Sequence, residues 1–315
     1  MLAYNVEPYI AAAIEGVLRQ KIAFPIELVI GEDCSKDNTR AVCSAYAEKY
    51  PGIVRVLPAT ENLGIAGNAA RTLEQCRGQY IAICDGDDVW SDPHKLAKQV
   101  QILELNADVG AVYTDVQTID AEDVPFDDPE HREIRELYAG GDIFFKLLQG
   151  NFINNSTAVF RRRLLDGYHI DRDRNYYTHD HLLWLHVAIH SKIQFIAEQS
   201  TLYRKHRGGV TNSAEKLANN KKKFQYHLFG ILQDFDRHYD RPVSAAERRL
   251  IFKKILSVLY RKENTPAMKF RALGMLPRYF PGFSSLANIL LGKLGRKTAT
   301  APNHTVLTTN LKSNT

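Results

Sequence analysis

The chain has 315 residues, of which 44% are hydrophobic and 24% are charged, as is typical of a globular protein with a substantial core. It contains no apolar run of about 18 residues, so we expect no membrane-spanning helix, and no signal peptide is visible. The four cysteines form no CxxC pair, which predicts reduced thiols in a cytoplasmic protein.

The net charge of +5 is unevenly distributed. Residues 248–297 hold twelve Lys and Arg against one acid, Glu263, whereas the remainder holds 29 basic and 35 acidic residues. A basic C-terminal segment on an acidic body predicts an anionic partner for that segment only. The run Lys221-Lys222-Lys223 is typical of a solvated helix face, and we expect no nucleic-acid partner.

The first part of the chain alternates helices and short apolar strands. Helices are predicted from Pro8 to Gln20, up to Tyr50 and up to about Cys76, and strands at Ile26–Ile30, Ile53–Leu57 and Tyr80–Cys84. This order predicts an α/β fold with a mostly parallel sheet flanked by helices. The chain opens at the polar end of what should be the first strand, so we expect that strand to be truncated.

The second part mixes further strands with helices. Helices are predicted at Pro93–Asn106, Asp142–Gln149 and Asp180–His190 (the last amphipathic), strands at Val109–Ile119 and Thr157–Arg161, and an acidic loop at Asp120–Glu136. The pattern is almost wholly helical from Ala214. We therefore expect a catalytic domain over 1–212, a basic helical region over 213–297 and a disordered tail over 298–315.

Three carboxylates, Asp85, Asp87 and Asp88, follow the strand predicted at Tyr80–Cys84. Ligands bind at the carboxyl ends of strands in open α/β sheets. Carboxylates this close repel each other, and a divalent ion shared with substrate phosphates would offset that repulsion. Alternatively, Asp88 or Asp92 caps the next helix.

Six motifs in order resemble glycosyltransferase family 2, the inverting, nucleotide-sugar-dependent enzymes with a GT-A fold. They are Ala3-Tyr4-Asn5 with Glu7, Glu32 to Thr39, Asn62-Leu63-Gly64 with Asn68, Asp85 to Trp90, His179-Asp180, and Tyr203 to His206. The Gly-Glu-Asp-Cys-Ser and Asp-Gly-Asp-Asp-x-Trp spellings resemble a subgroup common in bacterial surface-polysaccharide clusters.

The resemblance implies a nucleotide site at the first strand ends. Its residues would be Ala3, Tyr4, Asn5, Glu7, Asp33, Asn62, Asn68 and Asp85, with Asp33 at the base edge and Asp85 at the ribose. Asn62-Leu63-Gly64 is equally consistent with a plain turn. We expect Asp37 to cap its own helix rather than bind ligand.

The resemblance also implies a metal site and a flexible basic loop. Asp87 and His206 would hold Mn²⁺ or Mg²⁺, and Arg204 would bind the diphosphate, although Tyr203 to Gly209 is also consistent with a basic surface loop. His186 and His190 stand four residues apart but lack the acid of a zinc HExxH motif, so we expect ordinary structural or surface histidines.

By the same resemblance Asp180 would be the general base, although a carboxylate in the first turn of a helix is also stabilised by the helix dipole. Asn155 and Ser156 are weaker candidates for the acceptor side. The expected reaction is metal-dependent transfer of a sugar from a nucleotide-diphosphate donor to a hydroxyl of a glycan or lipid-linked glycan. Alternatives are a nucleotidyltransferase, whose Gly-rich phosphate loop is missing after Tyr4, and a non-catalytic glycan-binding pseudoenzyme.

The basic segment 248–297 allows two interpretations. Its apolar residues alternate with Lys and Arg, as in amphipathic helices that lie on anionic lipid. Helices that pack on the catalytic domain explain the pattern equally well. The first interpretation predicts a cytoplasmic protein attached to the inner face of the cell membrane.

Overall fold

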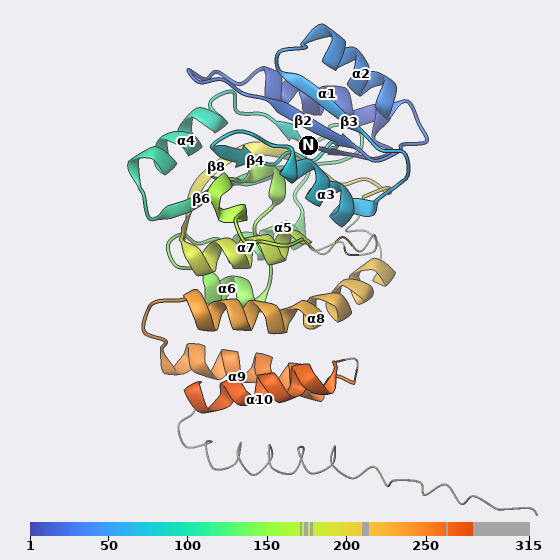
Figure 1. The fold of residues 1–315 in the computed structure, drawn as a ribbon. Coiled ribbons are helices and arrows are strands. Elements are labelled where there is room, and N and C mark those ends of the chain that lie inside the picture. Colours follow the sequence, from blue (N-terminus) through green and yellow to red (C-terminus); the bar gives the residue numbers. More distant parts are fainter. Residues whose placement is uncertain (171, 173–175, 177–178, 210–213, 263, 280–315) are drawn as a thin grey trace, which may run out of the picture. The chain divides into compact units, whose positions relative to one another are not determined.

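The computed structural model describes residues 1–170, 172, 176, 179–209, 214–262 and 264–279, in two compact units divided after Pro242 (Figure 1). The predicted tail over 298–315 lies outside the described residues, as do the side chains of Lys221, Lys222 and Lys223. In the part described, no helix has the length and apolar content needed to cross a bilayer.

Three parallel strands form the N-terminal sheet in the order β1 (Leu2–Ala3), β2 (Leu28–Glu32) and β3 (Val54–Pro58). A parallel bridge from Leu2 to Asp85 places β1 beside the segment that follows β4 (Tyr80–Ala82). In Figure 1, α1 (Glu7–Leu18) and α2 (Thr39–Lys49) lie above β2 and β3, and α3 (Gly64–Glu74) lies below. The two residues of β1 are therefore flanked on both sides.

Five strands form the second sheet, in the order β4, β7 (Val159–Arg161), β6 (Val109–Ile119), β8 (Lys192–Arg204) and β5 (Val89–Trp90). β6 and β8 are parallel, whereas β7 and β5 pair antiparallel with their neighbours. The predicted α/β fold with GT-A architecture is confirmed, and the antiparallel strands are an addition to it.

Helices cover the remaining chain at α4 (Lys95–Leu105), α5 (Pro129–Arg135), α6 (Phe144–Gln149), α7 (His179–His190), α8 (Ala214–His238), α9 (Ala245–Tyr260) and α10 (Pro266–Tyr279). The prediction of a continuous loop from Asp120 to Glu136 is wrong, because it contains α5. Asp128 caps that helix by accepting a hydrogen bond from the Glu130 N–H, and Pro129 occupies its first turn.

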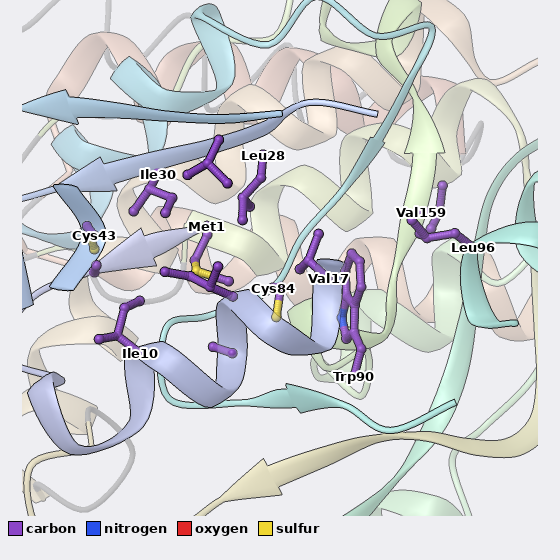
Figure 2. Packing of buried hydrophobic residues seen from close by; sticks show 14 of the residues in the cluster. Met1, Ile10, Val17, Leu28, Ile30, Cys43, Cys84, Trp90, Leu96 and Val159 are labelled. Atoms are coloured by element: carbon purple, nitrogen blue, oxygen red, sulfur yellow. The ribbon is translucent and has the colours of Figure 1, made fainter. Parts of the chain in front are cut away.

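The main core lies between α1 and the strands on either side of it (Figure 2). Ile10 and Ile14 on α1 are fully buried, and Val17 is 4% exposed, so one face of the helix is sealed. Trp90 packs at the end of this cluster, and its indole N–H donates to the Ser156 carbonyl at 2.7 Å. This packing fixes the end of β4, from which the acidic residues project.

Candidate active site

The acidic turn Asp85–Asp88 is held by a backbone carbonyl from β1 and by the hydroxyl of Ser156. The Gly86 N–H donates to the Leu2 carbonyl at 2.9 Å, and the Asp85 N–H donates to the Ser156 hydroxyl at 3.0 Å. A Cβ at Gly86 would lie 2.7 Å from the Leu2 oxygen, so only glycine permits this approach. The turn is thus placed against β1, at the carboxyl ends of the parallel strands.

Negative charge in this turn is incompletely neutralised. Burial, with the nearby Asp87 charge, raises the pKa of Asp85 to about 7. Burial raises the pKa of Asp88 well above its usual value, and Asp87 and Asp85 add to the effect. A cation bound here would lower both pKa values by favouring the ionised carboxylates.

The end of β8 brings a histidine to the acidic turn. His206 Nε2 lies 3.1 Å from Asp87 Oδ2, although 119 residues separate the two in sequence. The Arg204 N–H donates to Asp88 Oδ1 at 3.0 Å, which anchors this strand end. The ring of Tyr9, on α1, packs against the His206 ring with centroids 4.9 Å apart. The structure therefore brings Asp87 and His206 together.

The Arg204 side chain is only 1% exposed and binds protein groups. Its guanidinium donates to the carbonyls of Asp87 and Asp120, pairs with Asp123 at 2.6 Å and lies over the Tyr9 ring. These contacts make Arg204 a support for the acidic turn. The neighbouring Lys205 is likewise paired, with Asp128 at 2.6 Å and Glu130 at 3.0 Å.

Asp180 lies in the first turn of α7, where burial raises the pKa of its carboxyl to about 6. Hydrogen bonds from the backbone and from Asn151 oppose that shift, and Asn151 Nδ2 donates to Asp180 Oδ2 at 3.0 Å. The Asp180 charge also contributes to the raised pKa of Asp85, so the two carboxylates act on each other electrostatically. The structure therefore groups Asp180 with the acidic turn.

The ends of β1 and β2 are tied together by polar side chains. Asn5 has a left-handed φ of 52°, and its Oδ1 accepts from the Lys36 N–H at 2.8 Å. Glu7 accepts from both the backbone and the side chain of Asn38. Ala3 is buried in β1, whereas Tyr4 is 41% exposed. These candidates lie at two adjacent strand ends. A left-handed backbone such as that of Asn5 is often found at functional sites.

Asp33, Asn62 and Asn68 lie beside the end of β2. Both carboxylate oxygens of Asp33 accept backbone N–H groups, from Leu63 at 2.8 Å and Gly64 at 3.0 Å. Asn62 donates to the Asp33 carbonyl, so the segment 62–64 forms a turn closed on Asp33. Asn68 is 2% exposed and donates to the Gly31 carbonyl. In this structure these side chains organise the turn.

The predicted capping role of Asp37, at the start of α2, is confirmed. One carboxylate oxygen accepts from the Thr39 N–H at 3.0 Å, at the start of α2, and the other accepts from the Glu7 N–H at 3.1 Å. Asp92 similarly accepts from the His94 N–H before α4, whereas Asp88 binds Arg204 instead of capping. Of the two predicted capping candidates, Asp92 therefore caps the helix and Asp88 does not.

Two acceptor candidates lie on a short 3₁₀ helix, Asn155–Thr157. Ser156 is fully buried, and its hydroxyl binds the acidic turn, so it supports the turn from within. Asn155 is partly exposed as a residue, but its Oδ1 is buried without a hydrogen-bond partner among the described residues. Neither Tyr9 nor Asn151 carries a signal in the sequence, because each acts through contacts distant along the chain.

The histidines on α7 have structural roles, as expected. His186 is buried, and its Nε2 lies 2.9 Å from the Leu164 carbonyl, while the tilted His190 ring packs against it with centroids 4.6 Å apart. No described group of three or more His, Cys, Asp or Glu side chains is arranged to hold a metal by itself. Asp87 and His206 instead fit a divalent cation that takes its other ligands from water and phosphate oxygens.

Comparison with known proteins identifies the family. A family model described as glycosyl transferase family 2 matches residues 1–168. The chain belongs to glycosyl transferase family 2. It is therefore a glycosyltransferase, and the nucleotidyltransferase and pseudoenzyme alternatives are set aside. This chain is 30% identical over 276 residues to an uncharacterized protein of Mycobacterium tuberculosis. The match covers 86% of this chain and 76% of that protein.

Other relatives carry functional names. An uncharacterized glycosyltransferase of Nostoc is 31% identical over 225 residues, covering 70% of this chain and 67% of that protein. A putative teichuronic acid biosynthesis glycosyltransferase of Bacillus subtilis, TuaG, is 36% identical over 101 residues, covering 32% of this chain and 39% of that protein.

Solved structures share the fold at low identity. Staphylococcus aureus TarS in complex with UDP-GlcNAc is 17% identical with a TM-score of 0.52, over 90% of this chain and 73% of that one. The mannosyltransferase PcManGT of Pyrobaculum calidifontis, in complex with GDP-Man and Mn²⁺, is 19% identical with a TM-score of 0.55, over 95% and 78%.

Proposed function

We propose that this glycosyltransferase is a metal-dependent, inverting enzyme that uses a nucleotide-diphosphate sugar. The observation that carries the proposal is the 3.1 Å approach of His206 Nε2 to Asp87 Oδ2, beside a turn whose negative charge is incompletely neutralised. A divalent cation held by Asp87 and His206 would offset the charge of the leaving diphosphate. PcManGT, with the same fold, is known with GDP-Man and Mn²⁺.

The donor nucleotide would lie across the ends of β1, β2 and the acidic turn. Ala3, Tyr4, Asn5 and Glu7 would border it on one side, with Asp85 at the ribose. Asp33 would reach the base edge by exchanging its hydrogen bonds to the turn at 62–64, next to Asn62 and Asn68. Arg204 would keep the acidic turn in place as the diphosphate binds.

Asp180 would act as the general base. Its carboxylate would accept the proton of the acceptor hydroxyl as that oxygen bonds to the anomeric carbon. The bond from the anomeric carbon to the diphosphate oxygen breaks on the opposite face, and the electron pair leaves with the nucleoside diphosphate. A single displacement of this kind inverts the configuration.

The acceptor we propose is a hydroxyl of a surface glycan or of its lipid-linked precursor, with Asn155 on the acceptor side. Relatives named for teichuronic and teichoic acid biosynthesis support this class. We also propose that α9 and α10 bind an anionic membrane surface at the cytoplasmic face. Tyr260 is 81% and Phe270 49% exposed among lysines and arginines, a combination suited to lipid headgroups.

Thermal unfolding tests the donor and metal proposal. UDP or GDP with Mn²⁺ should raise the melting temperature of the parent, because ligands that bind the folded state stabilise it. Asp87→Ala should lose the Mn²⁺-dependent part of that rise. Asp92→Ala, which changes an acid that caps α4, is the matched control and should keep it. An Asp87→Ala protein with the parent's Mn²⁺-dependent shift would contradict the metal role.

A further inference from the structure

The segment Asn151–Ser156 contacts two acidic residues of the proposed site, one through its carboxylate and one through its backbone. At one end, Asn151 Nδ2 donates to Asp180 Oδ2 at 3.0 Å. At the other end, the Ser156 hydroxyl accepts from the Asp85 N–H at 3.0 Å. Asn151 belongs to none of the six family motifs in the sequence, and the proposed reaction does not use it.

The orientation of the Asn151 amide is fixed by its own loop. Its Oδ1 accepts from the Ile153 N–H at 3.2 Å, which turns Nδ2 toward Asp180. Phe152 and Ile153 are each 3% exposed, so this turn is anchored in the core. An amide oxygen bound to a backbone N–H leaves the NH₂ group as the donor, and that donor meets the carboxylate.

A general base needs both an ionised carboxylate and an oxygen free to face the acceptor. A donor to Oδ2 favours the ionised form and orients the carboxylate, whose remaining lone pairs can accept the hydroxyl proton. The backbone N–H groups of Asp180 and His181 also donate to this carboxylate, and its charge in turn raises the pKa of Asp85 and of the Tyr168 phenol. Burial acts against ionisation of Asp180, so the Asn151 donor works in the opposite direction.

We infer that Asn151 is a positioning residue that orients the Asp180 carboxylate and keeps it ionised for proton transfer. This inference rests on the proposed role of Asp180. It gives Asn151 a role in positioning the base beyond closing its own turn.

The test compares kcat/KM against pH for the parent, Asn151→Ala and Asn151→Ser. Serine can still close a turn on the Ile153 N–H but is too short to reach Asp180, so it separates loop folding from the contact with the base. We expect both variants to lose about tenfold or more in kcat with little change in donor KM. The acidic limb of the profile should move to higher pH, because the lost donor favoured the charged form.

Asn154→Ala is the matched control, since Asn154 closes a similar turn by accepting from the Ser156 N–H at 2.9 Å. The acidic limb of the kcat/KM profile of Asn154→Ala should stay at the pH found for the parent. A parental limb in Asn151→Ser, or the same shift in Asn154→Ala, would overturn the inference. Asp180→Asn separates a failure of the proposed base from a failure of the inference about Asn151. If it stays active, the base assignment fails. If it is inactive while the Asn151→Ser limb is unmoved, only the present inference fails.

Discussion

The proposed base, Asp180, would set a pH window for the reaction. Because burial raises its pKa to about 6, Asp180 is largely ionised near neutral pH and becomes protonated in mild acid. A protonated carboxyl cannot accept the acceptor's proton. We therefore expect kcat/KM of the parent to be level above about pH 7 and to fall as the pH drops through about 6.

Asp180→Asn tests the same residue. The amide is nearly isosteric but is not a base, so we expect the transfer rate to fall by about a hundredfold or more while the Mn²⁺-dependent binding of nucleoside diphosphate persists. Rates come from single-turnover transfer, and binding comes from thermal shift. A rate within a few-fold of the parent would remove Asp180 from the mechanism.

Residue pairs at the site were predictable only where a family resemblance linked them. The metal pair Asp87 and His206 was expected from motifs far apart in sequence, and the structure places the two side chains in contact. The resemblance also suggested Arg204 as a diphosphate ligand, but its guanidinium contacts Asp120 and Asp123. Those contacts depend on how β6 and β8 pair, which local sequence does not encode.

At the scale of elements, strand prediction followed burial. The strand β6 matches its predicted bounds, Val109–Ile119, because nearly all of its residues are buried and apolar or small. The longer β8 was not predicted, since Glu198 and Gln199 interrupt it and much of it is exposed. The two-residue β5 exists only because it pairs with β8. Tertiary context outweighs local preference in such strands.

Helix α4 carries a buried lysine with a measurable consequence. Lys95 is 1% exposed, and burial lowers its pKa to about 7, while its ammonium donates to Gln99 and lies over the Trp90 ring. The unfolded chain keeps the lysine protonated up to about pH 10. Between these values the unfolded state binds more protons, so this lysine makes the free energy of unfolding rise with pH.

We expect Lys95→Met to raise the melting temperature at about pH 6, where the cost of the buried charge is complete, and to raise it less or not at all near pH 10. Melting curves across this range measure the difference. Lys98→Met is the control on the same helix, because Lys98 is half-exposed and paired with Asp92. A gain that is independent of pH would show that Lys95 does not carry the titration.

At the scale of the whole molecule, the C-terminal unit invites a membrane test. We expect Tyr260→Ser with Lys253→Glu to reduce flotation of the full chain with vesicles containing anionic lipid, at low salt more than at high salt. Leu105→Ser is the matched control, because Leu105 is 76% exposed in the other unit. Unchanged flotation of the double variant would exclude this surface of α9.

The segment Asn151–Ser156 also bears on how such an enzyme can diverge. One short loop binds the backbone N–H of Asp85, in the acidic turn, and the carboxylate of Asp180, which is proposed to face the acceptor. In the proposed mechanism its length would set the spacing between the donor and the acceptor. Inserting or deleting a residue there would change that spacing, whereas substitutions elsewhere could alter which sugar or acceptor is held without disturbing it. New specificities in relatives should thus arise outside this loop, with its length preserved.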